Sequence, residues 1–230
     1  MTAKINRGAT VSGKVPRGRP PRAEAEHYRE RILDATTAVF LEKGFERAST
    51  NEIARRAQTS KQTLYALFPT KADLFAGVMR AHTEQLFSKH TYYIESAKAP
   101  SQTLTEIGYM VLNMFSAPEF LALYRIVVAE THNFPELARD LWREGVKRGN
   151  VLLAEYLQTR RIGGPNYGKS AAQFVSFVLG DFVLNAMLNP DLELSDRAVR
   201  ARVRGAVEDF LRLHPVPRTR KKERPHGVQR

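Results

Sequence analysis

The side chains best suited to recognising another molecule lie together in one short stretch, residues 49–71. Two short segments with apolar faces follow each other there, separated by the polar turn Gln58-Thr59-Ser60. The second segment places hydrogen-bonding residues on its outer side, namely Lys61, Gln62, Thr63 and Tyr65. Two short helices with a three-residue turn are typical of a helix-turn-helix, whose second helix enters the major groove of DNA. The alternative is a helical hairpin that only packs against the rest of the chain.

Residues with known preferences mark the ends of these two helices. Ser49 or Thr50 is expected to cap the first helix, and Glu52 stands at capping-box spacing from Ser49. Ser60 is expected to cap the second helix in the same way. Pro69 ends it, because proline has no N–H and restricts the residue before it.

Longer helices are expected on both sides of this stretch. Apolar periodicity and end signals place four helices in this part of the chain, at about residues 24–43, 50–57, 61–67 and 71–90. Gly44 ends the helix at residues 24–43, since glycine adopts positive φ readily. Thr70 is the expected cap of the fourth, which leads from the helix-turn-helix into the rest of the chain.

Five sequence segments follow one another here at uninterrupted spacing. They are Arg31-Ile32-Leu33-Asp34-Ala35, Phe40-Leu41-Glu42-Lys43-Gly44-Phe45, Thr50-Asn51-Glu52-Ile53-Ala54, Ser60-Lys61-Gln62-Thr63-Leu64-Tyr65 and Phe68-Pro69-Thr70-Lys71-Ala72-Asp73-Leu74. Together they resemble the DNA-binding domain of the tetracycline-repressor (TetR) family of bacterial transcriptional regulators, over about residues 26–86. Pro69 departs from the family pattern, and we expect it to tighten the turn without removing a contact.

The resemblance implies DNA contact by eight residues: Thr50, Thr59, Ser60, Lys61, Gln62, Thr63, Tyr65 and Lys71. Thr50, Tyr65 and Lys71 would hold backbone phosphates, which position the domain, while the others would face the groove. Gln62 is best suited to reading a base, because its amide can pair with N6 and N7 of adenine together. Lys61 would contact guanine or only a phosphate, and for Tyr65 a half-buried packing role is the alternative.

The net charge of +12 is concentrated at the two ends of the chain. Six basic residues and no acid lie in residues 1–23, and seven basic residues and one glutamate lie in residues 212–230. We expect disordered tails, at residues 1–23 and 213–230, which attract nucleic acid rather than a membrane because neither has an apolar face. Arg17 and Arg19 lie in Pro-Arg-Gly-Arg-Pro, which resembles an AT-hook and is predicted to enter the minor groove. A solubilising tail is the alternative.

The remainder, residues 90–212, is predicted to be an all-α body, because no alternating strand pattern occurs. Helices are expected at about residues 102–116, 119–131, 135–158, 168–188 and 196–212. With the first four, they give an all-α fold of about nine helices. Residues 123–130 and 134–138 resemble the C-terminal domain of the AefR-like subgroup. The two resemblances imply a helix-turn-helix head on a ligand-binding and dimerisation body.

The last two expected helices are apolar enough to form an interface between two copies of the chain. A helix that is apolar on all sides must be buried on all sides. Two helices from each copy would form a four-helix interface with twofold symmetry, and we therefore predict a homodimer. The predicted interface residues are Phe174, Val178, Phe182, Val199, Val203 and Phe210. The alternative is an internal core helix of a monomer.

A small apolar effector is a further expectation, because apolar pockets between bundle helices commonly bind ligands. The candidate lining residues are Met79, His82, Phe87, Met110, Tyr124, Trp142, Phe174 and Phe177. Aromatic residues at helical spacing are also what a plain core requires, so both readings stay open. Neither a metal nor a cofactor is expected, because the histidines lack metal-binding spacing and the chain has no cysteine.

These features predict a sequence-specific DNA-binding transcriptional regulator, a repressor released from a palindromic operator by a small apolar ligand. The alternative is an architectural or weakly specific DNA-binding protein without a ligand switch. An enzyme is not expected, because no nucleophile elbow, P-loop, dinucleotide fingerprint or paired-carboxylate motif occurs. No apolar run approaches the ~20 residues of a membrane helix, and we expect a cytoplasmic, nucleoid-associated protein.

Overall fold

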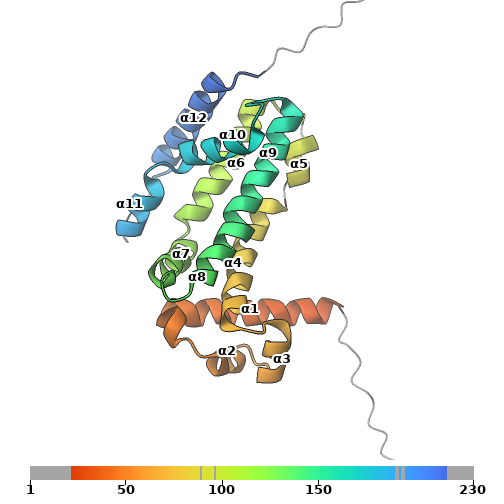
Figure 1. Ribbon diagram of the computed structural model, residues 1–230, viewed down its shortest axis with the longest axis vertical. Helices are drawn as coiled ribbons and strands as arrows, with labels where there is room; N and C mark the ends of the chain where they lie inside the picture. Colours follow the sequence, from red (N-terminus) through yellow and green to blue (C-terminus); the bar gives the residue numbers. More distant parts are fainter. Residues whose placement is uncertain (1–21, 89, 96, 190–191, 193–194, 217–230) are drawn as a thin grey trace, which may run out of the picture.

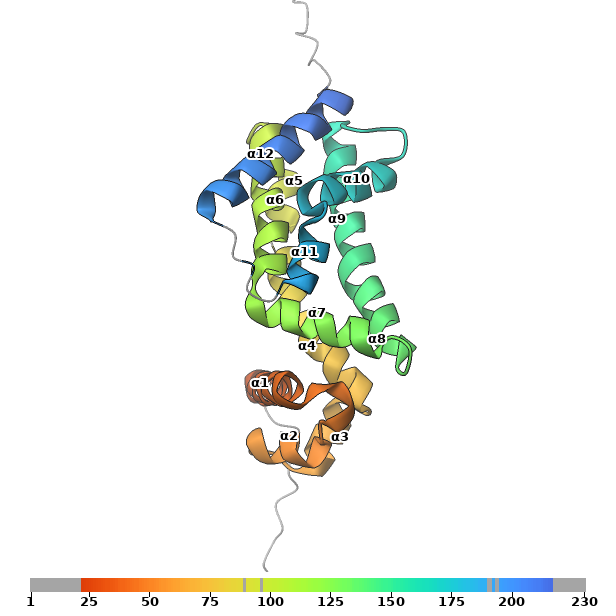
Figure 2. The same ribbon diagram turned by 90° about the vertical axis from the view of Figure 1, so that its left-hand side faces the viewer.

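The computed structural model describes residues 22–88, 90–95, 97–189, 192 and 195–216. Within these residues all regular secondary structure is helical and no strand occurs, which confirms the predicted all-α fold. A small head lies at one end of an elongated body, as Figure 1 and Figure 2 show. Most of the two predicted tails, with Arg17 and Arg19, lies outside the described residues. Their predicted bounds are wrong at the inner ends, because residues 22 and 23 belong to the first helix of the chain and residue 213 to the last.

The head consists of three helices, and a fourth leads into the body. They are α1 (Arg22–Arg47), α2 (Thr50–Arg56), α3 (Lys61–Leu67) and α4 (Lys71–Phe87). All four agree with the predicted positions. Gly44 has a φ of 74° and a ψ of 174° and interrupts α1, as a glycine stop should. Figure 1 shows α4 crossing α1 and rising from the head into the body.

The predicted caps are confirmed at two of the three helix starts. The Ser60 hydroxyl accepts from the Thr63 N–H at 3.0 Å, and Thr70 forms a reciprocal capping box with Asp73. The capping box predicted for Ser49 and Glu52 is wrong, since Ser49 makes no side-chain cap. The Glu52 carboxylate instead pairs with two basic side chains of the head.

The body contains more helices than expected. They are α5 (His90–Glu95), α6 (Pro100–Ser116), α7 (Pro118–Glu130), α8 (Pro135–Asp140), the π-helical segment η1 (Leu141–Lys147), α9 (Arg148–Arg160), α10 (Tyr167–Leu179), α11 (Phe182–Leu188) and α12 (Asp196–Leu213). The described residues therefore form twelve α-helices, against about nine predicted. Helix α5 was not foreseen, and two of the expected long helices are divided.

The two divisions have different causes. The expected helix at 168–188 breaks at Gly180, whose φ of 46° disfavours a side chain. The Arg202 guanidinium of α12 fixes this break by donating to the Leu179 carbonyl at 3.1 Å and to the Asp181 carboxylate at 2.7 Å. The expected helix at 135–158 instead widens into η1 between α8 and α9. Such π-helical turns are rare and often occur at functional sites.

The apolar core of the head extends into the body. The ring centre of Phe45, at the end of α1, lies 5.9 Å from that of Phe75 in α4. It lies 4.8 Å from the ring centre of Phe134, which precedes α8. Phe120, Leu123 and other buried side chains of α7 belong to the same cluster as the head residues. Figure 2 shows α7 and α8 lying across the end of the body that faces α1. The head is thus packed against the body as well as joined to it through α4.

Candidate nucleic-acid interface and body cavity

The outer face of α3 is polar, exposed and free of acidic side chains. Lys61, Gln62 and Thr63 are exposed, while Leu64 on the inner side is fully buried. The cap at Ser60 fixes the first turn, where its hydroxyl also lies 2.8 Å from that of Thr63. The structure therefore presents the predicted recognition residues together on one surface.

Thr50 and Tyr65 join α2 to α3 at this surface. The Thr50 hydroxyl lies 3.0 Å from the Tyr65 hydroxyl, and the Lys61 ammonium lies 5.7 Å from the centre of the Tyr65 ring. The Tyr65 side chain is partly exposed, so packing does not close it off from solvent or from a ligand. Two hydroxyls and one ammonium side by side form a donor group suited to a phosphate oxygen.

The Lys71 ammonium contacts the protein backbone. It donates to the Glu46 carbonyl at 2.8 Å and to the Ala48 carbonyl at 3.4 Å, and it lies 4.7 Å from the centre of the Phe45 ring. Partial burial lowers the pKa of Lys71, while Glu130 and Glu46 act in the opposite direction. Lys71 therefore ties the start of α4 to the connection between α1 and α2.

Ion pairs that sequence reasoning missed hold α2 against α1. The Lys43 ammonium pairs with the Glu52 carboxylate, and the Arg56 guanidinium bonds Glu52 at 2.7 Å and Glu42 at 2.6 Å. The hydrogen bond from Lys43 is the main reason that the pKa of Glu52 is low. The Arg31 guanidinium also donates to the Ala57 carbonyl at the end of α2, at 2.5 Å. These contacts fix the angle at which α3 is presented.

A cavity of about 530 Å³ lies in the body between α4, α5, α6, α7, η1, α9, α10 and α11. Its size lies within the range of ~300–1,000 Å³ that holds small-molecule ligands. Most of its lining is apolar or aromatic, and Tyr156 contributes a side chain whose pKa is raised by burial. Thr83 of α4 also lines it, so the cavity touches the helix that leads to the head.

Of the residues predicted to line a ligand pocket, Met110 and Tyr124 line this cavity. Met79 is buried in the core shared with the head, and His82 lies 4.0 Å from Glu119 without lining the cavity. Phe174 and Phe177 pack in the body core, so these four were assigned wrongly. Phe87 lies at the end of α4, and its side chain is outside the described part of the structure.

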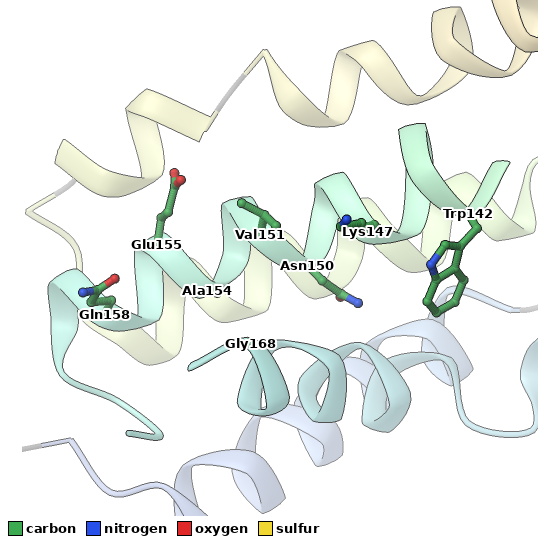
Figure 3. A pocket seen from close by; sticks show the side chains of 8 residues that line it. All are labelled: Trp142, Lys147, Asn150, Val151, Ala154, Glu155, Gln158 and Gly168. Atoms are coloured by element: carbon green, nitrogen blue, oxygen red, sulfur yellow. The ribbon is translucent and has the colours of Figure 1, made fainter. Parts of the chain in front are cut away.

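Trp142 lies in a separate, shallow groove rather than in the cavity. The groove measures about 290 Å³ and runs along the outer side of α9 beside the start of α10. Trp142 is 61% exposed there, and Val151 further along is also exposed. Figure 3 shows Trp142 and Asn150 both extending toward α10. Among the described residues, Asn150 alone lines both the groove and the cavity.

The residues predicted to contact a second copy are mostly inside a single chain. Five of the six are buried in the body core: Phe174, Val178, Phe182, Val203 and Phe210. Val199 is partly buried. The prediction is wrong at the five buried positions, because the apolar sides of α10 and α12 pack on each other and on α6. The exposed apolar residues of this region include Leu184 and Leu188 of α11 and Leu213 at the end of α12.

The described residues contain no group of three or more His, Cys, Asp or Glu side chains placed to hold a metal ion. Among the described helices, none is long and apolar enough to cross a membrane by itself. The bent pairs α6–α7 and α10–α11 meet that test together by length and composition only.

Two family descriptions match consecutive parts of the chain. The bacterial regulatory proteins of the tetR family match residues 32–78, and the C-terminal domain of AefR-like transcriptional repressors matches residues 102–214. With the head geometry, these matches define a helix-turn-helix regulator, which is a class of DNA-binding protein and not an enzyme. The chain belongs to the TetR family, and its body is of the AefR-like type.

Individual transcriptional regulators are also similar to this chain in sequence or in structure. The transcriptional activator FasR of Mycolicibacterium smegmatis is 36% identical over 91 residues, which are 38% of this chain and 42% of FasR. The alignments cover less than half the length of the first curated relatives that the chain matches. A TetR-family regulator from Mesorhizobium loti is similar in structure, with a TM-score of 0.73, 24% identity and coverage of 83% and 98% of the two chains. The flavonoid-responsive regulator FrrA has a TM-score of 0.67 at 29% identity, with coverage of 84% and 100%.

Proposed function

We propose that the protein is a sequence-specific transcriptional repressor that binds a palindromic operator as a homodimer and is released by a small apolar molecule. In this proposal the head together with α4, residues 26–86, is the DNA-binding domain, and the body, residues 90–212, dimerises and holds the effector. The observation that carries the proposal is the exposed, acid-free outer face of α3, held at a fixed angle by the ion pairs of α2. The match to AefR-like repressors supports repression, whereas FasR is an activator.

The residues of this face divide into two roles. Thr50 and Tyr65 hold a DNA phosphate with their paired hydroxyls, and Lys71 has a third N–H beyond the two directed at carbonyls. Gln62 and Lys61 lie exposed on the first turn of α3, where recognition helices contact base edges. Phosphate contacts position the head, and the base contacts select the operator.

The remaining three candidates form the turn that leads into α3. The hydroxyls of Ser60 and Thr63 bond each other, and Thr59 precedes them. We assign Ser60 and Thr63 to the geometry of the first turn as well as to the groove. The Ser60 hydroxyl also accepts from the Thr63 N–H, and either hydroxyl can donate to the other, so each exposed hydroxyl keeps one further hydrogen-bonding site for a base or a water.

A palindromic operator requires two heads, and exposed residues of α11 offer a surface for the second copy. Leu184 and Leu188 are 64% and 71% exposed, and they are one helical turn apart on the same side of α11. Large exposed apolar residues that lie together commonly mark a contact with another protein. We therefore place the twofold contact at α11 and at the exposed side of α12 next to it.

The effector acts through α4 in this proposal. Thr83 lines the cavity near one end of α4, and Lys71 fixes the other end to the head. A molecule that fits the cavity better when α4 is displaced shifts the equilibrium toward the state in which the two heads are further apart. The free energy of this shift is no larger than the difference between its binding free energies for the two states. The similarity to FrrA, which is described as flavonoid-responsive, supports an apolar and aromatic effector.

Selection of genomic DNA fragments by the purified protein tests the proposal. We expect enrichment of a palindrome whose half-sites lie about 10 base pairs apart or a multiple of that. A salt titration on the selected and on random DNA then excludes the architectural alternative, since non-specific binding is almost wholly electrostatic. Equal affinity for both DNAs at every salt concentration would contradict the proposal.

A further inference from the structure

The cavity of the body contains no charged side chain in its described lining, and this limits what it can bind. All of the described residues that line it are neutral. The nearest acid on η1, Glu144, lies outside the lining and bonds Arg143 at 2.9 Å. The Arg160 guanidinium lies 5.8 Å from the centre of the Tyr156 ring but does not itself line the cavity. A carboxylate or phosphate that entered the cavity would lose its hydration and meet no positive side chain in the described lining, which is strongly unfavourable.

Aromatic rings form a large part of one wall. The rings of Phe115 and Phe120 lie 5.2 Å apart at a steep angle, and those of Phe115 and Tyr124 lie 5.8 Å apart. Met110 and Met114 add polarizable sulfur to the same region. Ring edges and thioethers of this kind favour contact with a planar aromatic molecule.

The polar groups of the lining differ in whether they are already engaged. The Ser176 hydroxyl donates to the Ala172 carbonyl at 2.9 Å, and the Thr83 hydroxyl donates to the Met79 carbonyl at 3.2 Å. The Asn150 amide forms no hydrogen bond with the part of the chain that the structure describes. It has two donors and an acceptor, and it stands where the groove and the cavity meet.

We propose that the cavity binds a neutral, largely aromatic molecule with one hydroxyl or carbonyl group, that Asn150 pairs with this group, and that anionic molecules are rejected. The inference rests on the proposed function, since it names the class of effector for the cavity of that switch. It assigns Asn150 the role of distinguishing a hydroxylated ligand from the parent hydrocarbon. The lining itself excludes the charged congener.

Three matched probes test the charge and the polar group separately. They are phenanthrene, 9-phenanthrol and phenanthrene-9-carboxylate, and their binding to the full chain is measured by fluorescence titration without DNA. We expect the carboxylate to bind at least about 100-fold more weakly than the phenanthrol, because an unpaired charge would be buried. Equal affinities for these two probes, or no binding of any probe, would overturn the proposal.

Two substitutions test the assigned residues. Asn150→Leu should weaken phenanthrol binding about 5-fold and leave phenanthrene binding unchanged, because one hydrogen bond is lost. The control Asn113→Leu, at an exposed position of α6, should change neither. Met114→Lys should improve carboxylate binding at least about 10-fold relative to Met114→Leu, since it supplies a positive partner. Equal losses of both neutral probes in Asn150→Leu, or no gain for the carboxylate, would refute these roles.

The test of the ligand class can be distinguished from the test of the proposed regulatory function. Operator binding by the same variants is measured by gel shift, with circular dichroism as the check that each is folded. Probe binding that leaves the operator complex intact would support the assigned class of ligand and contradict the switch. If the protein binds no specific operator but shows the expected order of probe affinities, the proposed regulatory function is contradicted. The ligand class assigned to the cavity is then still supported.

Discussion

Lys71→Met is the substitution that most directly tests the coupling of the head helices. Methionine keeps most of the apolar stem over Phe45 and removes the ammonium that donates to Glu46 and Ala48. A desolvated hydrogen bond from a charged group contributes about 1.5–3 kcal/mol, but here one bond is long and the group is partly exposed. We therefore expect a loss of about 1–2 kcal/mol. For a chain of this size that lowers Tm by about 2–8 °C.

Differential scanning calorimetry measures this shift against a matched control. Lys61→Met removes an exposed ammonium with no carbonyl partner among the described residues, so Tm should change by less than about 2 °C. An unchanged Tm for Lys71→Met would show that the carbonyl contacts contribute nothing, and the reasoning would fail. The DNA role is tested separately, since a lost phosphate contact reduces the slope of log affinity against log salt by about 0.9. An unreduced slope would contradict the phosphate contact proposed for Lys71.

Three further predictions concern the head and the second copy. Tyr65→Phe should weaken binding to operator and random DNA alike, whereas Gln62→Ala should change the preferred base and cost about 1–3 kcal/mol on the operator only. Gel shifts on both DNAs compare them, and equal losses for Gln62→Ala would contradict base reading. Because the pKa of Glu52 is lowered in the folded head, its pairing stabilises the protein above the ordinary carboxyl pKa and is lost as the pH falls through the lower folded value. Thermal melts should therefore show a steeper loss of Tm in wild type than in Glu52→Gln between about pH 5 and pH 2, and parallel curves would contradict this. Leu184→Glu should shift the species seen by size exclusion to the single 26.0 kDa chain, whereas Val128→Glu, at an exposed position of α7, should not. A dimer that survives Leu184→Glu would place the interface elsewhere.

The helix-turn-helix could be predicted from the sequence because its signals are local. Ser60 and Thr70 cap the helices that directly follow them, and Gly44 and Pro69 interrupt the chain where they stand. A cap or a stop depends on residues within one turn, so spacing alone reveals it. The partners of Lys71 lie 23 and 25 residues away in the sequence, and no local pattern indicates them.

The packing of the body could be predicted only in part, for the same physical reason. Helix α10 is apolar on several sides, which indicates burial but not whether the cover comes from the same chain or from another copy. In the structure α12 and α6 of the same chain provide that cover. Phe174 of α10 and Val203 of α12 are therefore buried between these helices instead of exposed to solvent. Gly180 has no sequence signal that distinguishes a helix break from close packing. Its positive φ is visible only in three dimensions.

The shared core around Phe45, Phe134 and α7 makes the DNA-binding head thermodynamically dependent on the body. A head excised after α4 would expose the side of Phe45 that now contacts Phe134. It would also lose the buried residues of α7 that complete its core. Because both parts then gain or lose order together, the intact chain should melt in one cooperative transition. A molecule bound in the body cavity would then act on a head that has no separate folding equilibrium of its own.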